Sequence, residues 1–125
     1  MSVRFRSNCP INTALQLIGD KWSLLIMRDL LFENKYTFKE FLGSEENIAT
    51  NILSNRLKML EDYGIISKKK STNDKKVNIY SPTQIGIDLV PVLIEMALWS
   101  GRNKAQINPQ VPDDIIQLLT KMKQS

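Results

Sequence analysis

Hydrophobic and polar positions between residues 47 and 64 recur with the period of an α-helix. Three leucines fall on one face of this helix: Leu53, Leu57 and Leu60. The opposite face consists of amide, hydroxyl and ammonium groups: Asn51, Ser54, Asn55 and Lys58. Gly64 follows, and glycine readily adopts the left-handed conformation that ends many helices. The pattern predicts an amphipathic helix whose polar face is either an ordinary solvated surface or a surface that contacts another molecule.

Two helices are predicted earlier in the chain. The first covers residues 11–18, and Pro10 suits its first turn because a residue there needs no backbone N–H donor. The second, residues 21–31, is apolar on nearly all sides and should therefore lie at the centre of the fold. Within it, Trp22 is expected to be a core anchor rather than a group that stacks on a ligand.

A turn at residues 33–35 separates these helices from the segment that leads to residue 47. Tyr36–Thr37 is compatible with a very short strand, and residues 38–42 predict a brief helix with an apolar face. Residues 43–47 then turn the chain into the amphipathic helix. A short helix, a turn and a longer helix with a polar outer face follow the order of a helix-turn-helix motif.

The hydrophobic period changes after Gly64 and predicts a β-hairpin. Residues 65–70 and 77–80 form its strands, and Asn73-Asp74 is the turn signal. Five lysines lie in this segment against a single acidic residue, Asp74: Lys68, Lys69, Lys70, Lys75 and Lys76. Such a hairpin is either a solubilising edge strand or a wing that holds phosphate groups. Its position directly after a helix-turn-helix favours the wing.

The last long hydrophobic stretch runs from Thr83 to about Ala105 and is apolar on most sides. Its polar positions form one narrow stripe: Gln84, Asp88, Glu95 and Arg102. Because one small core can cover only part of such a helix, the remainder is expected to pack against a second copy of the chain. Pro91 should kink or interrupt it. Residues 107–112 predict a linker, and residues 113–122 a second amphipathic helix.

Composition places the chain among ordinary water-soluble proteins. It has 125 residues, of which 42% are hydrophobic and 24% charged, so we expect one modest core. The formal net charge of +4 is compatible with a polyanionic partner without requiring one. We find no apolar run of transmembrane length and no signal-peptide core, and therefore expect a cytoplasmic protein that does not contact a membrane.

Missing residue types argue against catalysis. The chain has no histidine, which is the usual general base and the commonest metal ligand, and its one cysteine cannot build a thiolate zinc site. It has no glycine-rich phosphate loop, and its acidic residues are scattered among basic ones. We therefore expect no enzyme activity, no metal site and no cofactor.

The segment from Cys9 to Leu31 resembles the opening of the HxlR-type winged-helix transcriptional regulators, which are relatives of the MarR regulators. After the Cys-Pro pair, the matching residues are Ile18, Gly19, Lys21, Trp22, Ser23, Leu24, Leu25, Ile26, Arg28, Asp29 and Leu30. Further matches are Phe38, Glu40, Phe41, Leu53, Ser54, Arg56, Leu57, Lys58, Leu60, Glu61, Gly64, Ile65, Tyr80, Ser81, Thr83, Gly86, Leu89, Pro91, Val92 and Leu93. The resemblance covers residues 9 to about 101, and its first block is highly specific.

This resemblance implies a mainly α fold with a small β-hairpin wing (α+β), a winged helix-turn-helix that dimerises through its N- and C-terminal helices. Residues 1–106 would be the DNA-binding and dimerisation domain, and residues 107–125 a linker and amphipathic helix outside the shared pattern. The family implies a cytoplasmic homodimer that regulates transcription at palindromic operators, and we expect a repressor. Some relatives sense electrophiles or oxidants through a cysteine like Cys9, which makes a small-molecule or electrophile effector a candidate.

The sequence departs from the family pattern at two positions that matter locally. Ala49 occupies the helix start, where relatives often have a small hydroxyl residue, so Asn47 is a candidate cap instead. Ile79 replaces a polar residue of the returning strand, which leaves the strand register open.

The DNA-binding residues follow from placing residues 50–63 in the major groove. Four polar residues are placed to meet base edges: Thr50, Asn51, Ser54 and Asn55. An asparagine amide can pair bidentately with adenine. Lys58 and Arg56 are predicted phosphate contacts, although Arg56 turns toward the core side and has a structural role as its alternative. The five hairpin lysines, Lys68, Lys69, Lys70, Lys75 and Lys76, should meet the DNA backbone or minor groove.

Cys9 is either a structural residue or a sensor thiol. A free cysteine is usually a buried, inert residue, but Cys9 precedes a helix N-terminus, whose dipole favours a thiolate, and Arg4 and Arg6 are near in sequence.

The alternatives to operator binding are a dimeric module that binds an acidic protein partner and an RNA-binding winged helix. RNA binding is disfavoured because aromatics make up only 7% of residues and the hairpin offers only Tyr80 for stacking.

Overall fold

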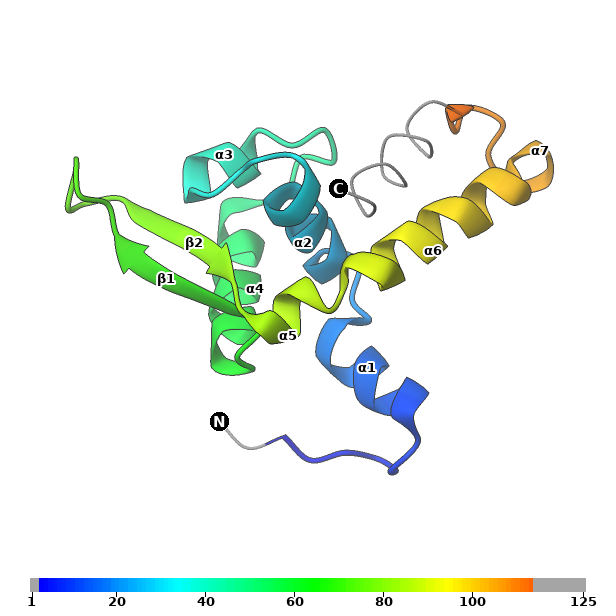
Figure 1. Cartoon of the computed structure of the whole chain (residues 1–125), viewed down its shortest axis with the longest axis horizontal. Helices are drawn as coiled ribbons and strands as arrows, with labels where there is room; N and C mark the ends of the chain where they lie inside the picture. Colours follow the sequence, from blue (N-terminus) through cyan, green and yellow to red (C-terminus); the bar gives the residue numbers. More distant parts are fainter. Residues whose placement is uncertain (1–2, 114–125) are drawn as a thin grey trace. The chain divides into compact units, whose positions relative to one another are not determined.

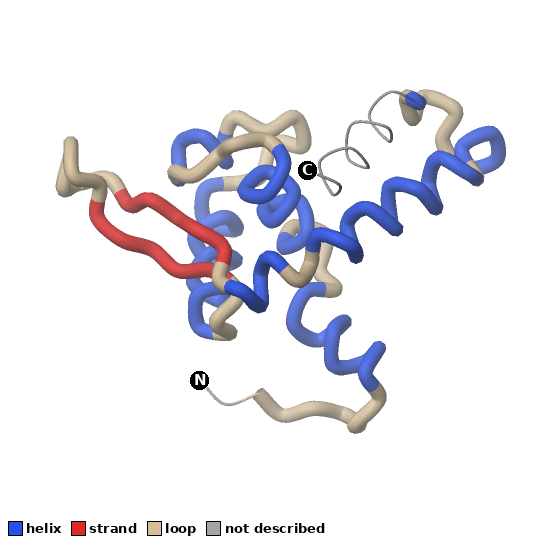
Figure 2. Tube along the Cα trace, in the orientation of Figure 1, coloured by secondary structure: helices blue, strands red, loops and turns tan. Residues whose placement is uncertain are grey.

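The computed structural model describes residues 3–113, and within them the chain forms seven helices and one two-stranded sheet (Figures 1 and 2). In chain order these are α1 (Pro10–Ile18), α2 (Ser23–Phe32), α3 (Phe38–Leu42), α4 (Thr50–Asp62), β1 (Ile66–Lys70), β2 (Asn78–Pro82), α5 (Gln84–Ile87), α6 (Val90–Arg102) and α7 (Lys104–Ile107). The chain divides into two units, Met1–Ile87 and Asp88–Ser125. The amphipathic helix predicted over residues 113–122 falls, apart from Asp113, outside the described residues.

The core of the first unit forms where the apolar faces of α2, α3 and α4 meet the hairpin. Its fully or nearly fully buried side chains are Ile26, Met27, Leu30, Phe41, Leu53, Leu57, Leu60, Ile65, Ile66 and Tyr80. The rings of Phe41 and Tyr80 meet edge to face, with 6.0 Å between their centroids. Removing each such side chain from water contributes roughly 1.5–3 kcal/mol. The predicted burial of the three leucines of α4 and the central position of α2 are therefore confirmed.

Helix α1 begins at Pro10, one residue before the predicted start, and leaves most of its apolar stripe uncovered. Ile18 is buried, whereas Ile11 is 73% exposed and Leu15 is 56% exposed. The N-terminal arm runs back along this helix because the side-chain amide of Gln16 accepts from Arg6 N–H (2.9 Å) and donates to the Arg4 carbonyl (3.1 Å). This helix thus carries an apolar surface that the described residues do not cover.

Asp20 caps the start of α2, a role that the sequence analysis did not assign. Its carboxylate accepts from the backbone N–H groups of Trp22 and Ser23 (both 3.0 Å) and from the Ser23 hydroxyl (2.5 Å). Trp22 itself is only half-buried, and its ring lies 5.0 Å from the Lys21 ammonium. The prediction of Trp22 as a core anchor is therefore only partly met.

Two predictions near the helix-turn-helix motif are wrong. Tyr36–Thr37 is not a strand, although the Tyr36 carbonyl accepts one hydrogen bond from Tyr80 N–H (2.8 Å). Thr37 instead caps α3 in a reciprocal capping box with Glu40. Asn47 does not cap α4: it has a positive φ of 58°, and Ala49 occupies the N-cap without a side-chain hydrogen bond. Asn47 instead donates its backbone N–H to the Ser44 carbonyl (3.1 Å), and its side chain makes no hydrogen bond to the first turn of α4 within residues 3–113.

Helix α4 ends as the sequence predicts. Gly64 has a φ of +75°, its N–H donates to the Glu61 carbonyl (3.0 Å), and the Ile65 N–H donates to the Leu60 carbonyl (2.9 Å). These two bonds define a Schellman motif, and Leu60 and Ile65 are both buried beside it. The motif directs the chain from the end of α4 into β1.

The hairpin has one fixed register. Its strands are antiparallel, with Lys68 opposite Tyr80, Lys69 opposite Ile79 and Lys70 opposite Asn78. Because side chains alternate across a strand, Lys68 and Lys70 share the face of buried Tyr80, whereas Lys69 lies on the other face with Ile79. Figure 1 shows the hairpin extending away from the end of α4. The fold is thus mainly helical with a small antiparallel hairpin, as predicted.

The long helix predicted from Thr83 to Ala105 is interrupted. Helix α5 ends at Ile87 and α6 starts at Val90, with Pro91 in the first turn of α6. Proline has no N–H to continue the ladder and its ring clashes with the carbonyl four residues earlier, so the predicted effect of Pro91 is confirmed. A third short helix, α7, follows after Asn103.

The stretch Gln84–Arg102 also corrects the expectation that no segment reaches transmembrane length. It spans 19 residues with a mean hydropathy of 1.2, which is long and apolar enough to cross a membrane by length and composition only. Asp88 and Glu95 interrupt the apolar run in this stretch, but the average hydropathy tolerates both charges. A single such helix is weak evidence for a membrane span, since core helices of water-soluble proteins meet the same criterion.

Candidate nucleic-acid interface

The outer face of α4 is polar and exposed along its whole length. Its exposed side chains are Thr50, Asn51, Ser54, Asn55 and Lys58. The Lys58 side chain is 75% exposed, and its ammonium lies 3.5 Å from Asp62 one turn later. An ion pair as exposed as this contributes little to stability, so the lysine can exchange Asp62 for another anion at small cost. The face therefore offers amide, hydroxyl and ammonium groups to a partner.

Arg56 differs from the other five α4 residues predicted to contact DNA because its side chain is largely buried and its guanidinium pairs with a residue outside α4. Nη1 lies 3.5 Å from the Asp20 carboxylate, and Nε and Nη2 donate to Oδ1 of Asn55 (3.1 and 2.6 Å). Its side chain is 21% exposed. The structural alternative that the sequence analysis considered for Arg56 thus has a specific geometry.

The wing lysines are exposed, but they are not equivalent. Lys68 lies 3.7 Å from Glu61 of α4. Lys69 and Lys70 make no such ion pair within residues 3–113, and Lys75 and Lys76 lie in the turn, where the Asp74 carboxylate accepts the Lys76 backbone N–H (3.0 Å). Four of the five ammonium groups are therefore available to an external anion.

A hollow of about 310 Å³ lies between α4, α3 and the hairpin. Its wall includes Ser54 and Lys58 of α4, Lys68 of β1 and Asn78 of β2. An adjoining hollow of about 430 Å³ is lined by Lys39 of α3 and Lys76 of the turn. The two hollows place recognition-helix and wing residues beside each other. Lys39 was missed by the sequence analysis, because only the fold brings α3 next to the hairpin.

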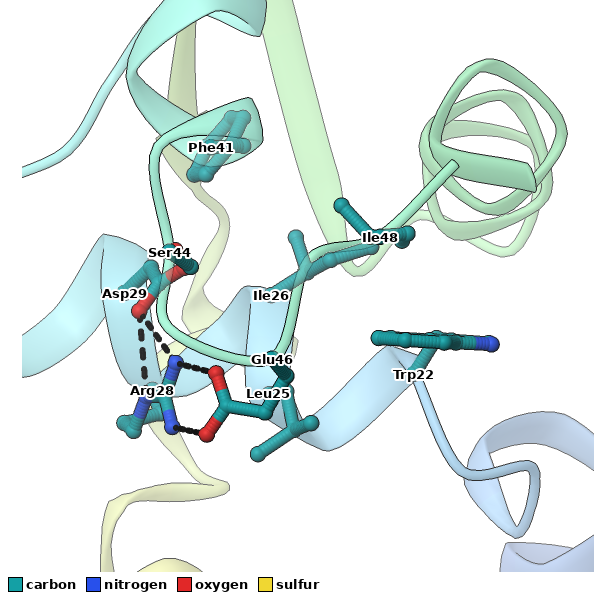
Figure 3. Close-up of a pocket in the computed structure, with 9 residues that line it drawn as sticks. All are labelled: Trp22, Leu25, Ile26, Arg28, Asp29, Phe41, Ser44, Glu46 and Ile48. Carbon is teal, nitrogen blue, oxygen red and sulfur yellow. Dashed lines mark hydrogen bonds and ion pairs between the residues drawn. The ribbon is translucent and has the colours of Figure 1, made fainter. Parts of the chain in front are cut away.

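An ion-pair network on α2 holds the loop that leads into α4 (Figure 3). Arg28 binds Glu46 through two hydrogen bonds (2.7 and 2.9 Å) and Asp29 through its Nε and Nη2 atoms (3.0 and 2.8 Å). The buried Asp29 also accepts from the Ser44 hydroxyl, which accepts from Lys35 (3.0 Å). The paired Arg28 lowers the pKa of Glu46 and these carboxylates raise the pKa of Arg28.

This network has a structural role rather than a ligand-binding one. The cavity beside it, lined by Trp22, Ile26 and Ile48 among others, has a volume of about 10 Å³. Such a volume holds about one water molecule, whereas ligand pockets usually exceed about 300 Å³. The network therefore fixes the loop between α3 and α4 on α2, and with it the start of α4.

The chain also has an exposed thiol and an exposed apolar groove. Cys9 is an exposed free cysteine at the N-cap of α1. In the second unit, α6 presents an apolar groove of about 590 Å³ that includes Val92, Met96 and Trp99. These three side chains are 42%, 49% and 56% exposed. Within residues 3–113, no group of three or more His, Cys, Asp or Glu side chains could hold a metal ion.

Known proteins with a similar sequence or fold are transcriptional regulators. The uncharacterized HTH-type regulator YdeP from Bacillus subtilis is 31% identical over 100 residues, which cover 80% of this chain and 77% of YdeP. The crystal structure of PA1607 superposes with a TM-score of 0.71 at 34% identity, covering 78% of this chain and 66% of that one. The redox regulator HypR in its oxidized form gives a TM-score of 0.65 at 30% identity, covering 76% of this chain and 97% of HypR.

A family model matches most of the chain. It describes HxlR-like helix-turn-helix proteins and matches residues 17–108, which include α2 to α7 and the hairpin. The helices α2, α3 and α4 followed by a two-stranded wing are the winged helix-turn-helix arrangement of these regulators. YdeP is named as a transcriptional regulator and HypR as a redox regulator. The chain is therefore a member of the HxlR-like helix-turn-helix family of transcriptional regulators.

Proposed function

We propose that the protein binds palindromic operator DNA in the cytoplasm as a homodimer and acts as a transcriptional repressor. The observation that supports this most directly is the position of the exposed polar face of α4 beside the lysine-bearing hairpin. A helix of this width fits the major groove of B-DNA, and basic side chains beside it can neutralise phosphates. In this proposal Thr50, Asn51, Ser54 and Asn55 meet base edges, and Lys58 and the wing lysines contact the backbone.

The proposed dimer is supported by apolar surfaces in each unit. Ile11 and Leu15 are exposed on α1, and Val92, Met96 and Trp99 are exposed on α6. Exposed aromatic and methionine side chains that form one groove are typical of protein interfaces. A two-fold dimer presents two recognition helices related by that symmetry, so its DNA site should be a palindrome. We propose that residues 1–106 contain both functions and that residues 107–125 are an appended tail.

We further propose that the regulator responds to a thiol-reactive effector through Cys9. Three observations support this: the thiol is exposed, it lies at the N-cap of α1, and the similar protein HypR is a redox regulator. An exposed thiol next to a helix N-terminus is accessible to oxidants and electrophiles. Because the chain has a single cysteine, any disulfide must join two chains or a chain and a small thiol.

DNA binding is tested by gel shift and footprinting on the DNA upstream of the protein's own gene. We expect a shifted complex and a protected region with two-fold symmetry. Duplex DNA of scrambled sequence and RNA of the same length serve as competitors, and each should compete poorly. Equal binding to the upstream and scrambled DNA, without a protected region, would contradict operator recognition, and stronger competition by RNA would favour the RNA-binding alternative.

The thiol response is tested by measuring DNA affinity before and after treatment with diamide or a quinone. The wild-type protein should lose affinity and gain mass, whereas Cys9→Ser should change in neither respect. A wild-type protein whose affinity and mass are both unchanged would make Cys9 a structural residue, and the effector would have to act elsewhere.

A further inference from the structure

Asn55 is the only recognition-helix asparagine whose amide is already hydrogen-bonded within residues 3–113. Its Oδ1 accepts from Arg56 Nε at 3.1 Å and from Arg56 Nη2 at 2.6 Å. Asn51, one turn earlier on the same exposed face, makes no hydrogen bond with its side chain in this part of the chain. The two asparagines thus present different hydrogen-bonding groups to the solvent.

Chemistry determines which way round the Asn55 amide lies. A guanidinium has five N–H donors and no acceptor, so the amide must turn its oxygen toward Arg56 and its NH₂ group away. A carbonyl oxygen has two lone pairs, and the two donors of Arg56 occupy both. The exposed part of Asn55 that remains free for a partner is therefore a pure hydrogen-bond donor.

Arg56 is itself fixed by an acidic residue on another element. Its Nη1 lies 3.5 Å from Oδ1 of Asp20, and its side chain is 21% exposed. Asp20 is held in turn by the Trp22 and Ser23 N–H groups and by the Ser23 hydroxyl. Partial burial would raise the pKa of Asp20, but these bonds and the charge of Arg56 outweigh it and keep the pKa below its usual value. The start of α2 thus sets the orientation of a side chain on α4.

We infer that Arg56 is a positioning residue that makes Asn55 a donor-only reader of the major groove, while Asn51 remains free to pair bidentately with adenine. This inference rests on the proposed binding of operator DNA. Bidentate recognition of adenine needs an amide oxygen for the N6 amino group and an amide nitrogen for N7. Asn55 has no free oxygen, so it can donate to N7 or O6 of guanine, N7 of adenine or O4 of thymine. Cytosine offers only an amino donor in this groove, and Asn55 should exclude it.

The experiment is selection of bound sites from random duplex DNA, followed by sequencing, which gives a base-preference profile. Wild-type protein should show one position that excludes cytosine without choosing a single base, and another position that requires adenine. In Arg56→Met the donors are lost and the Asn55 amide is free, so the first position should change to an adenine preference. A bidentate contact discriminates roughly 5- to 150-fold, which sets the size of the change.

The matched variants separate positioning from phosphate contact. Arg56→Lys keeps the positive charge but not the fork of donors, so its profile should move in the same direction as that of Arg56→Met. If Arg56 only neutralises phosphate, Arg56→Lys should keep the wild-type profile and Arg56→Met should weaken all sequences alike, which would overturn the inference. Arg56→Lys also decides the question if Arg56→Met proves unfolded in a thermal melt.

Asn55→Ala shows whether Arg56 acts through Asn55. The double variant Asn55→Ala/Arg56→Met should have the same profile as Asn55→Ala alone, and a further change would overturn the inference. Asn51→Ala should remove the adenine requirement at the second position, and that requirement should persist in Arg56→Met. The inference would also be overturned if the wild-type protein had a strict adenine preference that Asn55→Ala removes. If wild-type protein enriches no sequence, the proposed function itself fails, an outcome distinct from all of these.

Discussion

At the scale of single residues, Gly86 has no room for a side chain. A Cβ there would lie 2.3 Å from the Ile65 carbonyl oxygen and 3.2 Å from Cε of Met27. The oxygen belongs to the backbone that accepts the Thr83 N–H (3.1 Å), so it cannot move without breaking that bond. Gly86→Ala should therefore lower the free energy of unfolding by about 1–3 kcal/mol.

Urea denaturation checks this effect against Gly43→Ala. A Cβ at Gly43 would have only one neighbour, the Glu40 carbonyl at 3.4 Å, and its φ of −79° suits any residue. The control should unfold within about 0.5 kcal/mol of the wild type. Equal stability of the Gly86 and Gly43 variants would mean that the α5 helix shifts freely against β1.

The ion pair between Arg28 and Glu46 should make stability depend on acid pH. Arg28 holds the pKa of folded Glu46 below its ordinary value of 4.5, so the unfolded chain binds the proton more readily than the folded protein does. The stabilisation is complete above the unfolded value and is lost as the pH falls through the folded value.

Urea denaturation between pH 7 and pH 3 tests this dependence with Glu46→Gln. The variant should be less stable than the wild type at pH 7, and the difference should shrink as the pH falls below about 4.5. Glu45→Gln is the matched control, since its neighbour Glu45 is exposed and makes no ion pair within residues 3–113. A constant difference across this pH range would mean that Glu46 stabilises the fold by packing rather than by charge.

At the scale of elements, the hairpin should give DNA binding a steep salt dependence. Each phosphate neutralised contributes about −0.9 to the slope of log K against log salt. Lys69 has no ion-pair partner in the described chain, whereas Lys68 lies 3.7 Å from Glu61. Lys69→Ala/Lys70→Ala should therefore flatten the slope and weaken all DNA sequences alike.

Lys68→Ala is the comparison within the same hairpin. Because Glu61 already balances part of the charge of Lys68, Lys68→Ala should change the slope less than the single variant Lys69→Ala does. Affinities from fluorescence anisotropy at four or more salt concentrations give the slopes. If the double variant has the wild-type slope, the hairpin does not contact phosphate and is a solubilising edge.

The elements that the sequence predicts well are those with strong local signals. The leucine spacing and Gly64 locate α4 and its end, and Pro91 locates the break before α6. Contacts that form only when distant segments meet in the fold were not predicted. Tyr36 makes a single bond to the backbone of β2 instead of a strand, and no pattern in the sequence distinguishes the two.

The residues of the candidate site divide in the same way, into those that local patterns predict and those that only the fold brings together. Its exposed residues on α4 follow from helical periodicity, because the buried leucines fix which side chains face outward. The hollow that both Lys39 and Lys76 line could not be predicted. Two contacts could not be predicted either, because each joins residues that only the fold brings together: Asp20 with Arg56, and Glu61 with Lys68. These are also the contacts that decide which charges remain free for DNA.

At the scale of the whole molecule, the proposed function requires two copies of the chain. One recognition helix covers only a half-site, so a palindrome is read with specificity only if a second helix is held at a fixed spacing. The apolar groove on α6 is the surface whose burial would supply the free energy, since Trp99 and Met96 are about half exposed. Leu93 and Leu98 on the same helix are less exposed and less suitable targets.

Trp99→Asp and Met96→Asp should therefore convert the dimer to a monomer. Placing an uncompensated carboxylate in an apolar interface should cost at least about 2 kcal/mol, which raises the dissociation constant roughly 30-fold or more. Sedimentation at micromolar concentrations gives the mass, with Gln106→Asp on α7 as a control that adds the same charge at an exposed polar position. Affinity for a palindromic site should fall in the two interface variants, while affinity for an isolated half-site should not. A wild-type chain that sediments as a monomer, or interface variants that remain dimeric, would remove α6 from the interface and require another source for the two-fold site.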